Sequence, residues 1–391
     1  MGIDREDHEG RGAGAAGGAG GGTPDRAPDR DVNAACVNGE RRGGGQRNVP
    51  YRSVNAALRE RFGEKVYKLG LDIGCTCPNR DGTCGTGGCI FCAGGGTEFA
   101  ERSLPAPGGV PVPFRDHASE PEAWIGIDAM IDAAKARVEK KMPARDRGED
   151  GSAEPGRGRY VAYFQSYTNT YGDIARIGEC FRRAAARPDI CALAVATRPD
   201  CLGSEWIELL SELDRVKLVW VELGLQTIHE RTARLIRRGY DLPVFEDAFR
   251  RLKEAGLEVV VHVILGLPGE DEEDMRATVG YLAGLGRGAG GAGIDGIKLQ
   301  LLHVLAGTEL ARMYAEDPGV IRGFTPDEYA DLVIDLVEML PPEVVIHRLT
   351  GDGAKKLLIA PQWSANKKAV LNRLSERFRE RGAYQGRLFP G

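Results

Sequence analysis

Five of the nine cysteines in this chain lie within the glycine-rich stretch CTCPNRDGTCGTGGCIFC, which runs from Cys75 to Cys92. Thiolates bind zinc and iron, so metal binding is the chemistry to expect from this stretch. An odd number of cysteines in a long chain without a recognisable secretion signal favours a reducing compartment, where thiols bind metals or lie in the core. We therefore expect a thiolate metal site in this loop and no disulfides.

Each spacing within the loop suits a different metal site. Cys77, Cys89 and Cys92 offer three ligands to a four-iron cluster and leave one iron open. Cys84 with the last two cysteines has the spacing of a plant-type two-iron ferredoxin, whose fourth ligand would lie far along the chain. Cys75 and Cys77, together with Cys89 and Cys92, would close a four-thiolate zinc site. An open position is typical of a catalytic metal, so we favour the three-thiolate site, with zinc and ferredoxin as alternatives.

Short apolar runs alternate with helical patterns along the rest of the chain. Near-continuous apolar runs are typical of strands buried on both faces of a parallel sheet. Six such units predict an α/β fold, a partial (β/α)6 barrel whose ligands bind at the carboxyl ends of the strands. A doubly wound sheet is the alternative. The runs lie at 65–73, 160–165, 191–197, 218–224, 259–266 and 296–302, and a polar or glycine-rich loop follows each of them.

Composition divides the chain into three parts. Residues 1–48, rich in Gly, Ala and Pro and containing Cys36, predict a disordered tail. Residues 49–310 form the predicted barrel, and residues 311–391 form a small helical extension with a basic end. The net charge of −5 excludes a globally basic nucleic-acid binder. No run of eighteen uncharged apolar residues occurs, so we expect a cytoplasmic protein without a membrane segment.

Motifs in the cysteine loop and at the strand ends together resemble the radical S-adenosylmethionine (SAM) enzymes. The nearest likeness is to the YhcC-type group, a relative of the catalytic subunit of the elongator complex. The resembling motifs lie between about residues 50 and 365, and they occur in the same order as in that family. Its motifs are CPNRDGTCGTGGCIFC, YFQSYTNTY, ATRPDCL, VELGLQT, RRGYD, HVILGLPGE, GIKLQLLHVLAGTEL and PPEVVIHRL.

The resemblance implies both the cofactors and the reaction. Cys77, Cys89 and Cys92 would hold a [4Fe-4S] cluster, and Cys75 and Cys84 would not. The open iron would bind SAM, and an electron, supplied by a donor such as flavodoxin or ferredoxin, would cleave SAM reductively. The resulting 5′-deoxyadenosyl radical would then remove a hydrogen atom from the substrate.

The same resemblance implies contacts to SAM at the strand ends. A loop after the second predicted strand would accept hydrogen bonds from the SAM ammonium group. Gln226 would be a polar contact, Arg238 would clamp the carboxylate, and His262 would meet the ribose. The loop residues are Gln165, Ser166, Tyr167 and Thr168.

Three further side chains stand out in this part of the sequence. Glu222 lies in an apolar strand and should point into the barrel, where a buried carboxylate needs a partner. The candidates for that partner are Lys298 and Arg198. Related sequences commonly have His at the place of Tyr240, which leaves its role open. His303 ends the sixth strand and receives no role from the sequence.

The substrate is the least determined feature. The C-terminal segment mixes basic and aromatic residues, a composition compatible with RNA contact. The same pattern suits an amphipathic helix that covers the barrel with its apolar side. RNA, a metabolite and a protein are therefore all candidate substrates. A second class of function, a non-enzymatic zinc-binding or iron–sulfur electron-transfer protein, also fits the cysteine loop.

Overall fold

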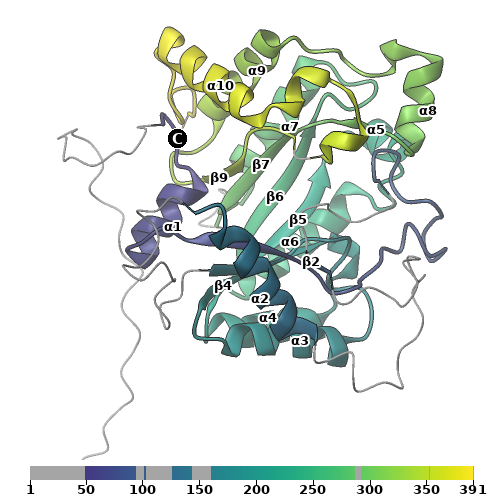
Figure 1. The fold of residues 1–391 in the computed structure, drawn as a ribbon. Coiled ribbons are helices and arrows are strands. Elements are labelled where there is room, and N and C mark those ends of the chain that lie inside the picture. The colour runs from purple at the N-terminus through teal and green to yellow at the C-terminus, as the bar shows by residue number, and fades with distance from the viewer. Residues whose placement is uncertain are drawn as a thin grey trace, which may run out of the picture. The chain divides into compact units, whose positions relative to one another are not determined.

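A curled parallel sheet of eight strands organises the chain (Figure 1). The computed structural model describes residues 49–93, 101–102, 126–142, 160–286, 292–351 and 353–390. The tail predicted at residues 1–48, with Cys36, lies outside them. In sheet order the strands are β2 (Glu101–Arg102), β1 (Tyr67–Asp72), β3 (Tyr160–Phe164), β4 (Ile190–Thr197), β5 (Leu218–Gln226), β6 (Glu258–Leu265), β7 (Gly296–Leu301) and β9 (Val345–Arg348).

The six predicted strands all form, and they stand in sequence order in the sheet. All neighbouring strands pair in parallel, so their carboxyl ends meet at one edge. Two further strands extend the sheet at its ends, and they were not predicted from the sequence. The curled sheet with its covering helices is the half-barrel expected from the alternating pattern.

Helices cover the outer face of this sheet. The face is apolar in alternate positions of the strands from β1 to β7, for example Val219, Val221 and Leu223 of β5, and these side chains belong to the main core. The helices of the barrel are α2 (Gly126–Glu139), α3 (Ile174–Ala186), α4 (Ser204–Asp214), α5 (Glu230–Leu235), α6 (Leu242–Glu254) and α7 (Glu272–Gly284).

The inner face of the sheet is filled differently along its length. At the amino end, α1 (Val54–Phe62) supplies Leu58 to a small apolar cluster with Val161 and Trp220. Small side chains of β4, such as Ala192 and Ala194, line the same region. Polar side chains follow toward the carboxyl edge. The inner face is therefore closed at one end and becomes polar toward the other.

The C-terminal part contributes to the sheet and to its cover. β9 pairs with β7, so the strand order continues past the sixth predicted strand. Val370, Leu374 and Phe378 form the buried side of α10 (Lys367–Arg381), which packs on α9 (Pro326–Met339). The remaining elements are α8 (Glu309–Glu316) and a two-stranded antiparallel ribbon of β8 (Val304–Leu305) and β10 (Leu358–Ala360). Among the described helices, none combines the length and the hydropathy needed to cross a membrane.

Candidate active site at the carboxyl edge of the sheet

The cysteine loop after β1 is folded by its own backbone. The Cys77 carbonyl accepts from the Arg80 amide at 2.8 Å, and the Asn79 carbonyl accepts from the Gly88 amide at 2.8 Å. Gly88 has φ +83°, in the left-handed region that glycine adopts readily. These bonds turn the chain back on itself. The long gap between Cys77 and Cys89 therefore forms a compact loop.

Cys77, Cys89 and Cys92 lie close enough for their thiols to act on one another electrostatically. Burial raises the pKa of Cys89 to about 11, and the nearby thiols of Cys92 and Cys77 act in the same direction. Burial likewise raises the pKa of Cys92, and the Cys77 thiol adds to that rise. All three side chains are only partly exposed. The loop thus gathers three thiols whose negative forms would be stabilised by a bound cation.

Two N–H donors point at these sulfur atoms. Asn79 Nδ2 lies 3.6 Å from Cys89 Sγ, and Arg80 Nη1 lies 3.7 Å from Cys92 Sγ. The positive charge of Arg80 also opposes the rise in the pKa of Cys92. Hydrogen bonds to sulfur tune iron–sulfur clusters. Sequence reasoning did not single out Asn79 or Arg80, although they lie two and three residues after Cys77 in the CPNRDG motif.

Cys75 and Cys84 are placed apart from this group. Cys75 belongs to the main core, and burial raises its pKa to about 12, with Arg176 and Cys180 among the groups that act on it. Cys84 is exposed. The four-thiolate zinc site that would include Cys75 is therefore not formed. Among the described residues, no group of three His, Cys, Asp or Glu side chains is placed to hold a metal ion.

The donor set still fits a four-iron cluster. A single zinc ion needs all its thiolates at about 2.3 Å from one centre. A cluster spreads its thiolates over different irons and so accepts a wider spacing of the sulfur atoms. The loop offers three partly buried thiols and two N–H donors directed at sulfur. This donor set fits a four-iron cluster better than a single zinc ion.

Asn79 also ties the cysteine loop to the segment between α5 and α6. Its side-chain amide donates to the carbonyls of Arg237 at 2.7 Å and Arg238 at 2.9 Å. Gly239, with φ +84°, lies so close that a Cβ there would come within 2.4 Å of Asn79 Oδ1. Arg198 Nη1 donates to the same Arg238 carbonyl at 2.8 Å. Glycine is therefore required where three loops meet beside the thiols.

The loop after β3, predicted to meet SAM, lies directly against the cysteine loop. The Thr168 amide donates to the Thr76 carbonyl at 3.1 Å, and the Tyr167 ring lies under the Arg80 guanidinium at 5.2 Å. Gln165 is partly exposed, whereas Ser166 is buried. Among the described residues, Ser166 Oγ has no hydrogen-bond partner. A buried hydroxyl without a partner is costly, and a polar ligand group would remove that cost.

Three non-glycine residues at this edge adopt left-handed backbone conformations. They are Tyr167 with φ 59°, Gln226 with φ 65° and Arg237 with φ 57°. Such conformations cost about 1–3 kcal/mol each and cluster at ligand-binding sites. Two of the three, Tyr167 and Gln226, are residues predicted from the sequence to contact SAM. The backbone is strained where a ligand was expected.

Arg238 does not have the arrangement expected of a carboxylate clamp. Its side chain is 1% exposed, and four of its five N–H donors bond within the protein. The acceptors are Tyr240 O at 2.8 Å, Leu225 O at 3.2 Å, Thr227 O at 2.7 Å and Glu230 Oε1 at 3.1 Å. The guanidinium therefore holds the loop after β5 in place. Carbonyl partners of this kind leave no signature in the sequence.

Tyr240 has a defined role in the same loop. Its hydroxyl donates to the Gly224 carbonyl at 2.5 Å and lies 3.4 Å from Gln226 Oε1. The ring lies between the guanidinium groups of Arg198 and Arg238, at 5.0 and 4.6 Å. Burial raises the pKa of this hydroxyl. Tyr240 thus orients the backbone and the side chain of Gln226.

The partner of Glu222 is Lys298. The two charged groups form a buried ion pair, and Lys298 also donates to the Tyr163 hydroxyl at 2.7 Å. Arg198, the other candidate, instead bonds both oxygens of Asp200, at 2.9 and 2.6 Å. Arg198 follows the last residue of β4 at the carboxyl edge, whereas Glu222 lies inside the sheet, so the two side chains serve different layers.

His262 and His303 occupy different surroundings. His262 Nε2 lies 3.0 Å from Gln300 Oε1 on the inner face, and burial, together with the charge of Lys298, lowers its pKa to about 3. It is therefore a neutral imidazole. His303 is hydrogen-bonded to Ser364 at 3.0 Å and accepts from the Gly353 amide at 3.2 Å. It fastens the C-terminal segment to the end of β7.

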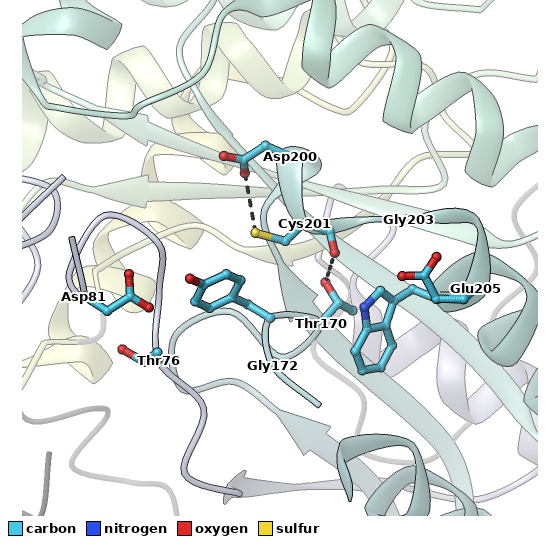
Figure 2. A pocket seen from close by; sticks show the side chains of 10 residues that line it. Thr76, Asp81, Thr170, Gly172, Asp200, Cys201, Gly203 and Glu205 are labelled. Atoms are coloured by element: carbon cyan, nitrogen blue, oxygen red, sulfur yellow. Dashed lines mark hydrogen bonds between the residues drawn. The ribbon is translucent and has the colours of Figure 1, made fainter. Parts of the chain in front are cut away.

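A cavity of about 490 Å³ opens beside the cysteine loop (Figure 2). Figure 2 shows Cys201 among the lining residues, with its backbone carbonyl accepting from the Thr170 hydroxyl at 2.7 Å. Among the described residues that line it are the carboxylates of Asp81, Asp200 and Glu205, and none of them is Lys or Arg. Asp200 is already paired with Arg198, so Asp81 and Glu205 are the carboxylates that can act on a group in this cavity.

Comparison with known proteins defines the class. The sequence profile of the Radical SAM superfamily matches residues 82–282, and that of the Radical_SAM C-terminal domain matches residues 294–380. The first match spans more than half of the chain and begins after Cys77. The chain belongs to the radical SAM superfamily, whose members are enzymes that use a [4Fe-4S] cluster and SAM. A non-enzymatic function is thereby set aside.

Within that superfamily the chain falls in the YhcC-type group. It is 38% identical over 340 residues to YtqA of Bacillus subtilis, covering 87% of this chain and 92% of that protein. It is 32% identical over 326 residues to YhcC of Escherichia coli, covering 83% and 91%. The structure of the archaeal Elp3 of Methanocaldococcus infernus shares the fold, with a TM-score of 0.52 and 18% identity over 67% of this chain and 60% of that chain.

Proposed function

We propose that this chain cleaves SAM reductively at a [4Fe-4S] cluster held by Cys77, Cys89 and Cys92. The observation that carries the proposal is the gathering of these three thiols, with Asn79 and Arg80 donating toward two of them. When bound, the cluster supplies the electron that breaks a carbon–sulfur bond of SAM and yields a 5′-deoxyadenosyl radical. The protein's own residues place SAM and keep water away.

SAM contacts are proposed at two neighbouring loops. Residues 165–168 offer the buried hydroxyl of Ser166 and backbone carbonyls for the ammonium group, as the family resemblance implies. Gln226 has a left-handed backbone conformation and contacts Tyr240. It offers a side-chain amide at the loop after β5. Arg238 is assigned to support of this loop, because its donors are engaged by carbonyls and by Glu230. The neutral ring of His262 faces the inner side of the sheet below Gln226.

The test begins with anaerobic purification and reconstitution, followed by iron and sulfide assay. Adding dithionite and SAM should release 5′-deoxyadenosine from the wild-type protein. Cys77→Ala, Cys89→Ala and Cys92→Ala should each abolish both the cluster and the product. Cys84→Ala is the matched control, since that thiol lies in the same loop but is exposed, and it should change neither.

Two outcomes would overturn the assignment. A colourless protein that holds one zinc would remove the cluster altogether. Loss of iron in Cys84→Ala with retention in Cys77→Ala would move the site to the ferredoxin-type spacing. Cys75→Ala is a second control, because its buried thiol lies in the core and its loss should affect packing only.

RNA as the substrate receives limited support from the structure. The C-terminal segment is basic, but the arginines of α10 that face α9 are paired with aspartates. The pairs are Arg373 with Asp327, Arg377 with Asp331 and Arg381 with Asp335. RNA that copurifies with the protein and is lost at moderate salt would support this substrate, and an unchanged RNA modification profile in its absence would count against it.

The chain also needs an electron donor and a reducing environment. The described cysteines are all free thiols, which is typical of the cytoplasm and agrees with the proposed cluster. A reduced flavodoxin or ferredoxin should replace dithionite in the cleavage assay. Cleavage that depends on the concentration of the reduced donor would identify a physiological electron source.

A further inference from the structure

The side chain of Arg80 is held beside the sulfur atom of Cys92. Its Nη1 atom lies 3.7 Å from Cys92 Sγ, and its guanidinium lies over the Tyr167 ring at 5.2 Å. Gly88 lies against the same side chain, since a Cβ there would come within 3.0 Å of Arg80 Nη1 and 3.2 Å of its Cγ. The aromatic ring and the glycine thus fix where the guanidinium lies.

Among the described residues, no carboxylate is paired with Arg80. The one hydrogen-bond acceptor of its side chain in that part of the chain is Cys92 Sγ. Arg198, a second guanidinium that acts on a thiol of the site, differs in this respect. It bonds both oxygens of Asp200, at 2.9 and 2.6 Å. The charge of Arg198 is therefore offset by a carboxylate, whereas that of Arg80 is directed at the thiol.

Asn79, which also donates toward sulfur, is bonded mainly to backbone. Its Nδ2 atom lies 3.6 Å from Cys89 Sγ but only 2.7 and 2.9 Å from the carbonyl oxygens of Arg237 and Arg238. An amide carries no net charge, and these two carbonyls engage both of its N–H groups. Asn79 is therefore a link between two loops. Arg80 is the residue whose effect on sulfur is electrostatic.

A cation beside a thiolate ligand favours the reduced form of a metal cluster, because reduction adds negative charge. Hydrogen bonds to sulfur and net charge both set the reduction potentials of iron–sulfur clusters. Arg80 is partly exposed, so water screens part of its charge. The charge that remains and the N–H donor act in the same direction, and both make the cluster easier to reduce.

We propose that Arg80 raises the reduction potential of the cluster in the cysteine loop, and that Tyr167 positions Arg80 for this role. The proposal rests on the proposed function, because it needs the cluster in that loop. In the step concerned, the cluster takes one electron from an external reductant, and no bond of the protein forms or breaks. Tyr167 also belongs to the loop 165–168 assigned to SAM, so its ring links that loop to the charge beside Cys92.

The test is a redox titration of the reconstituted full-length protein without SAM, followed by the electron paramagnetic resonance signal of the reduced cluster. Titanium(III) citrate with dye mediators supplies the electron. For Arg80→Met we expect electron uptake to be about tenfold less favourable, which is a potential about 60 mV lower for one electron. Arg80→Lys keeps the charge without the planar group and should lie between wild type and Arg80→Met.

Two companion variants separate this effect from a general loss of charge. Arg237→Met removes a guanidinium from the loop whose backbone touches Cys89, but this side chain is more than half exposed and pairs with Glu309 at 3.3 Å. It should change electron uptake by less than about twofold. Tyr167→Leu keeps Arg80 but removes the ring under it, and should lower the potential by less than Arg80→Met. Iron and sulfide assays check that each variant holds a complete cluster.

The first set of outcomes concerns Arg80 itself. An equal or higher potential in Arg80→Met than in wild type, with a complete cluster in both, would overturn the proposal. A shift of the same size in Arg237→Met would show a general charge effect and would overturn it too. If Arg80→Met holds no cluster, Arg80→Lys and Tyr167→Leu decide, and wild-type potentials in both would contradict the role of Arg80.

The second set separates this proposal from the proposed function. A wild-type cluster that depends on Arg80 as expected but does not cleave SAM would overturn the proposed function and leave the role of Arg80 standing. SAM cleavage with a potential that does not depend on Arg80 would do the reverse. Wild-type protein that assembles no four-iron cluster would overturn both.

Discussion

Three arginines of α10 are paired with aspartates of α9 on the surface, whereas the lysines inside the sheet outnumber the carboxylate beside them. The surface ladder joins Arg373 with Asp327, Arg377 with Asp331 and Arg381 with Asp335. Inside, Lys68 and Lys298 share Glu222. The basic composition of the C-terminal segment is thus used to join two helices. Unbalanced charge is kept where water is scarce, which is typical of a binding site.

The largest expected effect comes from breaking the inner pair. Lys298→Met strands the Glu222 carboxylate in a buried position, and losing one partner of a buried pair costs about 3–5 kcal/mol of the free energy of unfolding. Denaturant unfolding of the variant and the wild type measures it. The double variant Lys298→Met, Glu222→Leu should recover part of the loss, since the buried carboxylate is gone although Lys68 then loses the charge that favours its protonated form.

A small loss in the free energy of unfolding of Lys298→Met would contradict the contrast between the inner ion pair and the surface ladder. It would mean that Lys68 moves to neutralise Glu222 without cost. Lys68→Met made in the Lys298→Met background should then show the full penalty, because Glu222 loses the second lysine that acts on it. Circular dichroism before unfolding checks that each variant begins from the native fold.

Much of the fold follows from the sequence, because hydrophobic patterning is local. All six apolar runs became strands, since buried parallel strands need little more than a continuous run. β9 was missed because its four residues follow two prolines and pair with β7, nearly fifty positions earlier. Its other edge is bonded through Ile346 to Arg52, a contact with no local pattern.

The roles of the site residues were harder to predict where a cationic side chain bonds to backbone carbonyls. Arg238 looked like a ligand clamp, but its partners are carbonyls that any sequence supplies. The choice between Lys298 and Arg198 as the partner of Glu222 depended on which layer each side chain occupies, and only the three-dimensional register gives that. The roles of Asn79 and Arg80 needed the folded loop. The resemblance therefore located the site, and the geometry sorted its residues.

Lowering the pH should have an intermediate effect on the free energy of unfolding. His262 has a pKa of about 3 when folded, against 6.5 for an ordinary histidine. The unfolded chain therefore binds more protons between these values, so stability falls as the pH drops below about 6.5. From pH 7 to 5 we expect His262→Gln to lose about 1–2 kcal/mol less than wild type. Urea unfolding at both pH values measures this difference.

His347 titrates in the same direction in both proteins, since burial lowers its pKa too, and its contribution cancels. Parallel pH profiles for wild type and His262→Gln would show that the ring is charged or solvated in the folded protein. The inner face of the sheet around His262 would then be wetter than its exposure indicates, and the contrast with the surface ladder would weaken.

The smallest effect should come from the surface ladder itself. Arg373→Met makes the same kind of change as Lys298→Met, but its partner Asp327 is more than half exposed. Both groups are accessible to water, so the loss in the free energy of unfolding should stay below about 1 kcal/mol and shrink as salt is added. A loss as large as that of Lys298→Met, or one insensitive to salt, would show that water is excluded from the ladder as it is from the pair of Lys298 and Glu222. The surplus of positive charge inside the sheet would then no longer distinguish a functional region from a structural one.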